Sequence, residues 1–163
     1  MPSKKKNPSQ ERVEKKSPSQ ERLDVANFIQ SALDSGDSFD EILEHVIAGA
    51  TFQCDVLDVK LASKKTIKAY WIWHKRFVQA CPDSKFKLNQ GFLQEKKRQV
   101  VFLGTWTGTH TEVGGPVEPT GKSFSSHIVH ILDFNEDAEC TGMTKIWNDA
   151  ATFRDLGWPL NAE

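Results

Sequence analysis

Apolar residues near the start of the chain recur at the spacing of an α-helix. They lie three or four positions apart at Leu23, Ala26, Ile29 and Leu33. Ser19 before this stretch is a suitable N-cap, and Gly36 beyond it is a suitable end. The pattern therefore predicts a helix over about residues 20–34.

Two more helices and a short strand are predicted in the next part of the chain. Apolar residues indicate a short helix over about 39–48 that ends at Gly49, and the apolar run at 51–54 is a candidate strand. A third helix is predicted over 64–80, because Ser63 can cap it and a broad apolar face follows. That face includes Ile67, Tyr70, Trp71, His74, Phe77 and Val78.

Beyond Asp83 the period of the pattern changes from that of a helix to two. Alternation and β-branched or aromatic runs predict strands that begin at Lys85 and then cover 100–109, 123–134 and 141–147. A closing helical turn follows at Asp149, and Gly157 and Pro159 end it.

This order of elements, helices first and adjacent long strands second, is typical of an α+β fold. The helices are expected on one face of a curved antiparallel sheet. A strongly twisted sheet wrapped around a long helix leaves a cone that is open at one end, which is a natural apolar pocket. We therefore predict a cone-shaped α+β barrel.

Charge divides the chain into two parts. Residues 1–22 carry seven Lys or Arg and three Glu, while the remainder has a net charge of −5, so the overall value of −1 describes neither part. The sequence Pro-Ser-Gln-Glu-Arg at 8–12 recurs at 18–22, and its first copy is almost free of apolar residues. We predict a disordered basic tail over 1–19 and one domain over 20–160.

Composition narrows the class of protein. Five Trp and ten Phe exclude a wholly disordered chain, and the acidic domain is not expected to bind nucleic acid. No apolar run is long enough for a membrane span. Three cysteines without a CxxC motif favour the cytoplasm or another reducing intracellular compartment.

Three histidines in the strand-rich half are candidates for chemistry. His110 ends one predicted strand, while His127 and His130 lie three apart in the next and so face opposite sides of the sheet. Only one of these two can point into the pocket, and both faces are too mixed for periodicity to choose. No His, Cys or carboxylate spacing matches a zinc site. We therefore expect neither a metal nor a cofactor.

Asp149 is a candidate acid/base group at the end of the last predicted strand. At the mouth of an aromatic cavity, burial raises the pKa of a carboxyl, and such a group can move protons to and from carbon. The same residue stands where a helix N-cap is expected, with Asn148 as the alternative cap. A capping carboxylate stays ionised, so the two roles compete, and the spacing favours the cap.

Aromatic residues on the third helix and the strands are candidates to line the pocket, although most belong to the core at such spacing. Tyr70 is the only tyrosine and hence the only phenolic donor for an oxyanion hole. The predicted ligand-binding residues are Tyr70, Trp106, His127, Trp147 and Asn148. The loop at 114–122, with three glycines and two prolines, predicts a shaped hairpin that could overhang this pocket.

Two stretches resemble a known family. Gly108-Thr109-His110-Thr111-Glu112-Val113-Gly114-Gly115-Pro116, continued by Pro119-Thr120-Gly121-Lys122, resembles the hairpin of SnoaL-like proteins, which belong to the nuclear transport factor 2-like superfamily. Met143-Thr144-Lys145-Ile146-Trp147-Asn148-Asp149, followed by Leu156-Gly157-Trp158, is similar to the end of that family. The resemblance implies the same cone of helices and curved sheet, commonly dimeric through the sheet.

The family's enzymes include polyketide cyclases that close a ring by an aldol step with an acid/base Asp. The resemblance thus implies catalytic roles for Asp149, His130 and His110. The family's usual acidic position falls on Asn148, and a slip of one residue on a strand reverses the face of a side chain.

Three hypotheses remain open at this point. The first is a cofactor-free cyclase, isomerase or dehydratase that acts on a small hydrophobic carbonyl compound. The second is a binding module that holds a small ligand or a partner protein without turnover. In the third, the basic tail tethers the domain to an acidic partner.

Overall fold

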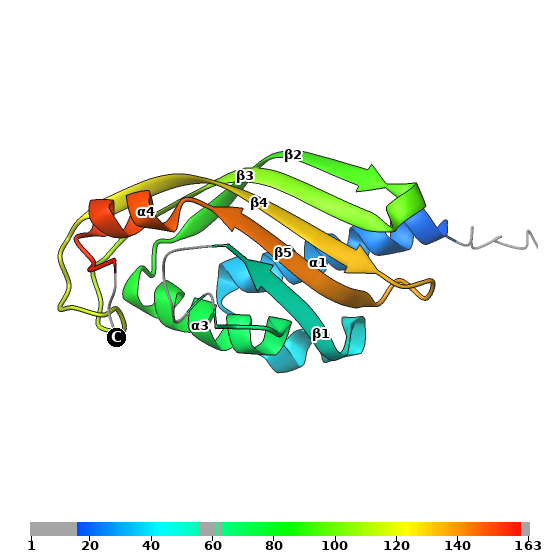
Figure 1. Ribbon diagram of the computed structural model, residues 1–163, viewed down its shortest axis with the longest axis horizontal. Helices are drawn as coiled ribbons and strands as arrows, with labels where there is room; N and C mark the ends of the chain where they lie inside the picture. Colours follow the sequence, from blue (N-terminus) through cyan, green and yellow to red (C-terminus); the bar gives the residue numbers. More distant parts are fainter. Residues whose placement is uncertain (1–15, 56–60, 62, 161–163) are drawn as a thin grey trace, which may run out of the picture.

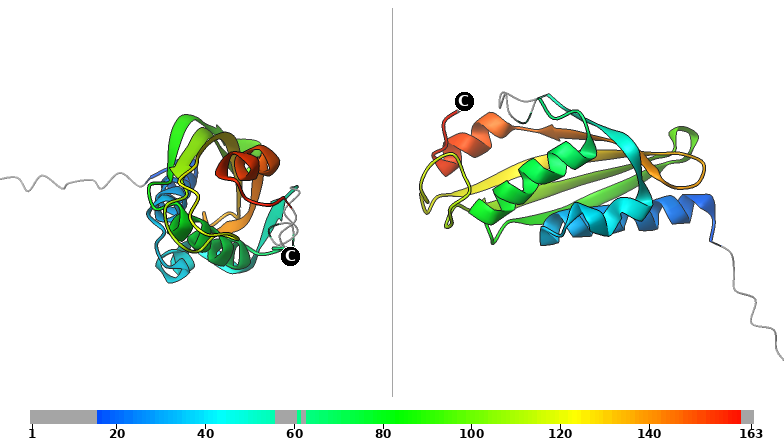
Figure 2. Two further views of the ribbon diagram at one scale, coloured as in Figure 1. Left: turned by 90° about the vertical axis from the view of Figure 1, so that its left-hand side faces the viewer. Right: turned by 90° about the horizontal axis from the view of Figure 1, so that it is seen from below.

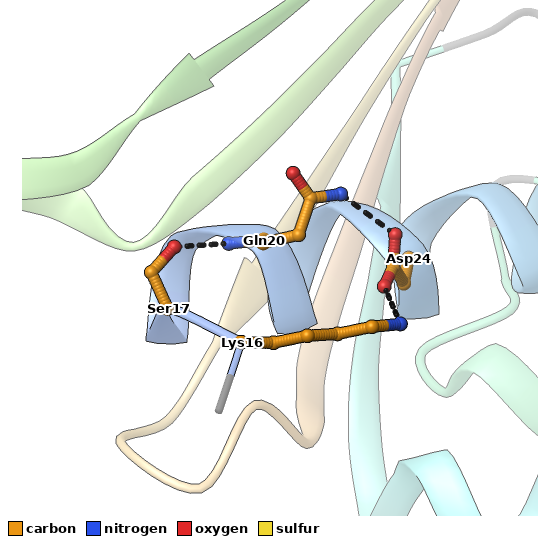
Figure 3. A network of polar contacts seen from close by, with 4 residues as sticks. All are labelled: Lys16, Ser17, Gln20 and Asp24. Carbon is orange, nitrogen blue, oxygen red and sulfur yellow. Dashed lines mark hydrogen bonds and ion pairs between the residues drawn. The ribbon is translucent and has the colours of Figure 1, made fainter. Parts of the chain in front are cut away.

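The computed structural model describes residues 16–55, 61 and 63–160. Residues 1–15 of the tail predicted over 1–19 lie outside these residues, and residues 18 and 19 belong to the first helix. The first helix, α1 (Pro18–Ser35), begins two residues before the expected start, because Ser17 and not Ser19 is its N-cap. The Ser17 hydroxyl accepts a hydrogen bond from the backbone N–H of Gln20 at 3.2 Å, and Lys16 pairs with Asp24, eight residues further along the chain (Figure 3).

The region between the first and third helices differs most from the prediction. A 3-10 helix, η1 (Phe39–His45), starts at the expected Ser38 cap, but strand β1 (Val46–Cys54) replaces its predicted last turn. The reason is tertiary, because β1 pairs with the last strand of the sheet. Gly49, expected as a helix end, instead has a φ of 78° where the register of that pairing shifts.

Helix α3 (Ile67–Ala80) carries most of the aromatic residues expected of the third helix. It begins three residues later than predicted, because the Thr66 hydroxyl, and not that of Ser63, caps it by accepting from the N–H of Ala69 at 3.2 Å. The last helix, α4 (Asp149–Leu156), begins and ends as predicted, but its N-cap is Asn148. The Asn148 side-chain oxygen accepts from the N–H of Ala151 at 3.1 Å.

Five strands form one curved sheet in the order β1-β5-β4-β3-β2 (Figure 1). Strands β2 (Lys85–Gln94), β3 (Gln99–Thr109), β4 (Ser123–Phe134) and β5 (Cys140–Trp147) form the predicted antiparallel part. A short 3-10 turn, η2 (Glu95–Lys97), joins β2 to β3. Strand β1 adds a parallel edge beside β5, so the complete sheet is mixed.

Helices α1 and α3 cover one face of the sheet, and the sheet curves over them in the end-on view (Figure 2). Burial along β4 alternates with the strand period, so every second side chain points toward the helices. His130 lies on this inner face and is buried, whereas His127 lies on the outer face and is exposed. The structure thus shows that His130, and not His127, is the histidine of β4 that points toward the helices.

In the described part of the chain, no helix is long and apolar enough to cross a membrane. The three cysteines, Cys54, Cys81 and Cys140, are all buried in the core as thiols.

Candidate active site

A small cavity lies between the helices and the inner face of the sheet. Its volume is about 10 Å³, which is room for a single water molecule. It is lined by Gln30, Asp34, His74, Phe86, Trp106, Ile128, His130 and Lys145. Five of these eight side chains are polar, although most of the buried side chains of the domain are apolar.

Lys145 is the most unusual of these residues, because its side chain is only 1% exposed. It lies on β5 between Met143 and Trp147, and all three point inward. The Lys145 Nζ lies 4.2 Å from the ring centre of Trp147 and 4.5 Å from that of Trp106. Tyr70 and Trp73 complete a cage of four rings at 5.3 and 5.6 Å. Aromatic faces attract a cation and exclude water from it.

A chain of hydrogen bonds leads from Lys145 across α3 to α1. The Lys145 Nζ donates to the Tyr70 hydroxyl oxygen at 3.3 Å, and that hydroxyl lies 3.4 Å from Nδ1 of His74. The Nε2 of His74 lies 3.1 Å from the carbonyl oxygen of Leu33, which can only accept. His74 is therefore protonated on Nε2, and its Nδ1 accepts the proton of Tyr70.

Burial sets the protonation of this chain. Desolvation lowers the pKa of Lys145 to about 7, although the negative charge of Asp149 opposes the shift. Desolvation, assisted by the charge of Lys145, lowers the pKa of His74 to about 3, so the imidazole is neutral. Near neutral pH the amine of Lys145 is accordingly present in both its charged and its neutral form.

His130 is held by a second set of contacts, from α1. Its Nδ1 lies 2.7 Å from the amide oxygen of Gln30 and must donate to it. Burial, with the nearby charge of Lys145, lowers the pKa of His130 well below its usual value. In a neutral ring protonated on Nδ1, Nε2 carries a lone pair. That atom is buried in the cavity without a hydrogen-bond partner among the described residues.

Asp34 lies at the half-buried edge of the cavity and contacts Gln30, the residue that holds His130. It accepts from the Gln30 amide nitrogen at 3.3 Å, and its position next to the backbone N–H of Phe86 joins α1 to β2. Because Asp34 takes the amide nitrogen, the amide oxygen of Gln30 is turned toward His130. Desolvation raises the pKa of Asp34 to about 6, although these two hydrogen bonds oppose the shift.

The structure brings together some of the residues predicted from the sequence. His130 and Trp106 line the cavity, and Tyr70 and Trp147 contact Lys145 without lining it. The proton of Tyr70 is directed to His74, so a ligand in the cavity would meet the amine of Lys145 as its donor. His127 lies outside, on the exposed face of the sheet.

Neither Asp149, the predicted acid/base residue, nor Asn148, a predicted ligand-binding residue, lines this cavity. Asn148 is exposed and serves as the helix cap, so the expectation that Asp149 is the cap is wrong. Asp149 is the first residue of α4 and is 4% exposed. Its negative charge raises the pKa of Lys145, which lines the cavity.

His110 is buried at the far end of β3, away from the cavity lining. Its Nδ1 accepts from the indole N–H of Trp158 at 3.0 Å and from the backbone N–H of Thr120 at 3.3 Å. Gly115 lies against both rings, because a Cβ there would be 2.7 Å from Trp158 and 3.0 Å from His110. The Gly-rich hairpin therefore packs on His110 and the C-terminal segment and not over the cavity.

Sequence reasoning missed Lys145, Gln30 and Asp34. The inward position of Lys145 could have been predicted from the strand period. Lys145 is two residues before Trp147 and so shares the inward face of β5. Gln30 and Asp34 lie one turn apart beside the apolar stripe of α1, where polar residues are ordinarily solvated. Their role depends on contacts with β2 and β4, which no local pattern contains.

Across residues 16–55, 61 and 63–160, no three His, Cys, Asp or Glu side chains gather where they could hold a metal ion. The polar groups of the cavity include the amine of Lys145, the imidazole of His130 with its lone pair and the carboxyl of Asp34 with its raised pKa. These groups can donate and accept protons and can stabilise a developing negative charge.

Solved structures with the same fold are numerous. AclR from Streptomyces galilaeus matches with a TM-score of 0.66 and 21% identity, over 85% of this chain and 82% of that one. A SnoaL-like protein from Jannaschia Sp. CCS1 matches with a TM-score of 0.68 and 14% identity, over 90% and 99%. IdmH from Streptomyces antibioticus, a candidate polyketide cyclase, matches with a TM-score of 0.64 and 19% identity, over 83% and 98%.

These likenesses confirm the α+β, nuclear transport factor 2-like fold expected from the sequence. No curated protein matches the chain. The family model for SnoaL-like polyketide cyclases matches residues 23–156, which run from within α1 to the end of α4. The chain therefore belongs to the SnoaL-like polyketide cyclase family.

Proposed function

We propose that the protein is a cofactor-free enzyme that moves a proton at a carbon next to a carbonyl group, as a cyclase, isomerase or dehydratase does. One observation carries the proposal. A single buried cavity holds both an imidazole nitrogen with a free lone pair, on His130, and an amine, on Lys145. A base and a group that activates a carbonyl are the two parts that such a reaction needs.

In this proposal Nε2 of His130 accepts the proton that leaves carbon, while Lys145 activates the carbonyl group. Gln30 positions His130 through its Nδ1–H, and the aromatic cage positions the amine. Burial matters for both groups, because electrostatic interactions with the developing enolate are stronger where water is excluded. In this proposal Asp149, the acid/base residue implied by the resemblance, acts through its effect on the pKa of Lys145.

The substrate is proposed to be small and hydrophobic. A cavity of about 10 Å³ admits only a group of the size of a carbonyl oxygen. The remaining part of the substrate needs an entrance, and the half-buried Gln30 and Asp34 mark one between α1 and β2. Phe86, whose ring stacks on His130 with centres 5.7 Å apart, must move aside when a larger substrate enters.

The test is exchange of the α-protons of phenylacetone for deuterium in D₂O, followed by NMR. We expect the full chain to accelerate the exchange and His130→Gln to lose about a hundredfold or more of that rate. His127→Gln is the matched control, because His127 lies on the same strand and faces outward. Equal rates with and without the full chain would instead support the binding-module alternative.

We also propose a homodimer through the outer face of the sheet. Leu103, Val129 and Ile146 lie side by side on adjacent strands, since Leu103 pairs with Val129 and Val129 with Ile146. Ile146 is 56% exposed, and the other two are partly exposed. A continuous apolar row on an open face is typical of a surface that binds another protein.

A further inference from the structure

The amine of Lys145 has surroundings that suit a nucleophile. Its nitrogen contacts the hydroxyl oxygen of Tyr70 and the faces of four aromatic rings, and it borders the cavity. Lysine is a strongly hydrated residue that is almost never fully buried. A donor that served only to bind a carbonyl oxygen would be available from a hydroxyl or an amide at a lower cost of desolvation.

We propose that Lys145 acts covalently: its Nζ attacks the carbonyl carbon of the substrate and forms a Schiff base. This inference rests on the proposed function and specifies how the carbonyl is activated. Lysines that form Schiff bases are typically buried in apolar pockets, where the neutral amine is accessible. The lowered pKa of Lys145, about 7, agrees with this role, because a large fraction of the amine is neutral near neutral pH.

The chemistry balances without a cofactor. The nitrogen lone pair forms the C–N bond, the carbonyl π electrons move to oxygen, and one N–H proton is transferred to that oxygen to give a carbinolamine. The hydroxyl then takes a second proton and leaves as water, while the nitrogen lone pair forms C=N to give an iminium ion. Asp34, the carboxyl at the cavity edge with a pKa of about 6, is the source we assign to that second proton.

His130 completes the sequence in the same cavity. Its Nε2 takes the α-proton of the iminium ion, and the C–H electron pair forms an enamine, which is the nucleophile that closes a ring or is reprotonated elsewhere. Addition of water to the resulting iminium then releases the product and restores the amine. The four rings around Nζ stabilise the iminium cation as they do an ammonium ion, and they limit premature hydrolysis.

The experiment is reductive trapping. The full chain is incubated with phenylacetone and sodium cyanoborohydride, and intact mass is measured and mapped to peptides. We expect one adduct, with the mass of the ketone less its oxygen atom, on the peptide that contains Lys145. Lys145→Met should form no adduct there, while Lys87→Met, which removes an exposed lysine of β2, should label as the parent does. An adduct that persists in Lys145→Met would overturn the assignment.

A second variant separates this inference from the proposed function. Lys145→Arg keeps a positive donor but has no nucleophilic amine, so we expect it to lose both the adduct and the α-proton exchange. If Lys145→Arg retains exchange and the parent gives no adduct, the covalent step is wrong while the proposed proton transfer stands. If the parent forms the adduct without accelerating exchange, the nucleophile is right and the proposed function is wrong.

The dependence of trapping on pH gives an independent check. Attack requires the neutral amine of Lys145, and loss of water requires the protonated carboxyl of Asp34, so the rate of adduct formation at Lys145 should pass through a maximum between about pH 6 and 7 and fall on either side. A rate that instead rises only near pH 10.5, the ordinary pKa of a lysine, would show that an exposed amine reacts and would contradict the inference.

Discussion

The amide oxygen of Gln30 lies 2.7 Å from Nδ1 of His130, although the two residues are 100 positions apart in the chain. This contact decides which ring nitrogen carries the proton. Because Asp34 in turn takes the amide nitrogen of Gln30, the amide cannot rotate without losing a hydrogen bond. A half-buried carboxyl on α1 thus determines the orientation of a lone pair on β4.

Replacing Gln30 tests this relationship. Gln30→Met removes the acceptor for Nδ1–H and leaves both tautomers of His130 accessible, so we expect α-proton exchange to slow about tenfold, the equivalent of one hydrogen bond. The tautomer is read from the ¹⁵N chemical shifts of the ring. Gln30→Glu restores an acceptor and should return the Nδ1–H tautomer while raising the pKa of His130. An unchanged ¹⁵N spectrum in Gln30→Met would show that the contact does not select the tautomer.

The burial of Lys145 makes stability depend on pH in a definite direction. The unfolded chain holds a proton on this amine up to about pH 10.5, whereas the folded chain releases it above about 7. Unfolding therefore takes up a proton between these values, and the free energy of unfolding gains a contribution that rises with pH. Lys145→Met lacks that contribution.

We expect Lys145→Met to be the more stable protein at pH 7 and its advantage to shrink as pH rises toward 10.5. Urea denaturation of both proteins across this range measures the difference, and other titrating groups cancel because they are common to both. Parallel stability curves would mean that the amine is not desolvated in the folded state.

Asn148 and Asp149 should respond differently to substitution although they are neighbours. Asn148→Ala removes the cap of α4 and should lower the free energy of unfolding by about 1 kcal/mol. Asp149→Asn keeps the cap but removes a negative charge that favours the ammonium form of Lys145, so the pH at which trapping is fastest should move lower. If Asp149→Asn instead abolishes trapping at every pH, the residue has a direct part in the reaction.

Because Gly104 on β3 has no side chain, the ring of Phe86 can lie directly against its backbone. A Cβ at Gly104 would lie 2.2 Å from a ring carbon of Phe86 and 2.7 Å from the backbone oxygen of Lys87. Gly104→Ala should therefore cost about 1–3 kcal/mol of stability and displace a wall of the cavity. Gly91→Ala is the matched control, because its nearest contact would be an ordinary 3.4 Å, and thermal unfolding of the two variants should differ clearly.

The outer face of the sheet gives a prediction about assembly. Ile146→Asp places a charge in the row formed with Leu103 and Val129, so we expect the dimer to dissociate while the α-proton exchange of the monomer persists. Light scattering coupled to size exclusion measures the mass. Thr144→Asp, a change on the same strand face but outside the row, should leave the mass unaltered. A parent chain that elutes as a monomer would contradict the proposal directly.

The sequence was most informative where local pattern and tertiary structure agree. The strand at 123–134 was predicted with the bounds that β4 has, because its alternation continues through all twelve residues. Strand β1 was assigned partly to a helix, since its pairing with residues of β5 is not encoded nearby. The α1 cap was misplaced by two positions, because Ser17 and Ser19 are equally suitable by type and Pro18 favours the first helical position.

The candidate site was harder to predict than the fold. His130, Tyr70, Trp106 and Trp147 were recognised as candidates because their residue types are uncommon and chemically distinctive. Lys145 was not, because lysine is ordinarily a surface residue, and only its register with Trp147 places it inside. The sequence does not predict Asp34, because its raised pKa depends on burial against β2, which sequence spacing does not reveal.

The parallel pairing of β1 with β5 has a consequence for how the chain is made. Val46 pairs with Cys140, so the edge of the sheet cannot be completed until almost the whole domain has left the ribosome. During synthesis the apolar side chains of α1 and β1 remain exposed to water until the later strands that bury them have been made. Such distant pairing slows folding, and the nascent N-terminal third should therefore be the part of this protein that binds chaperones during translation.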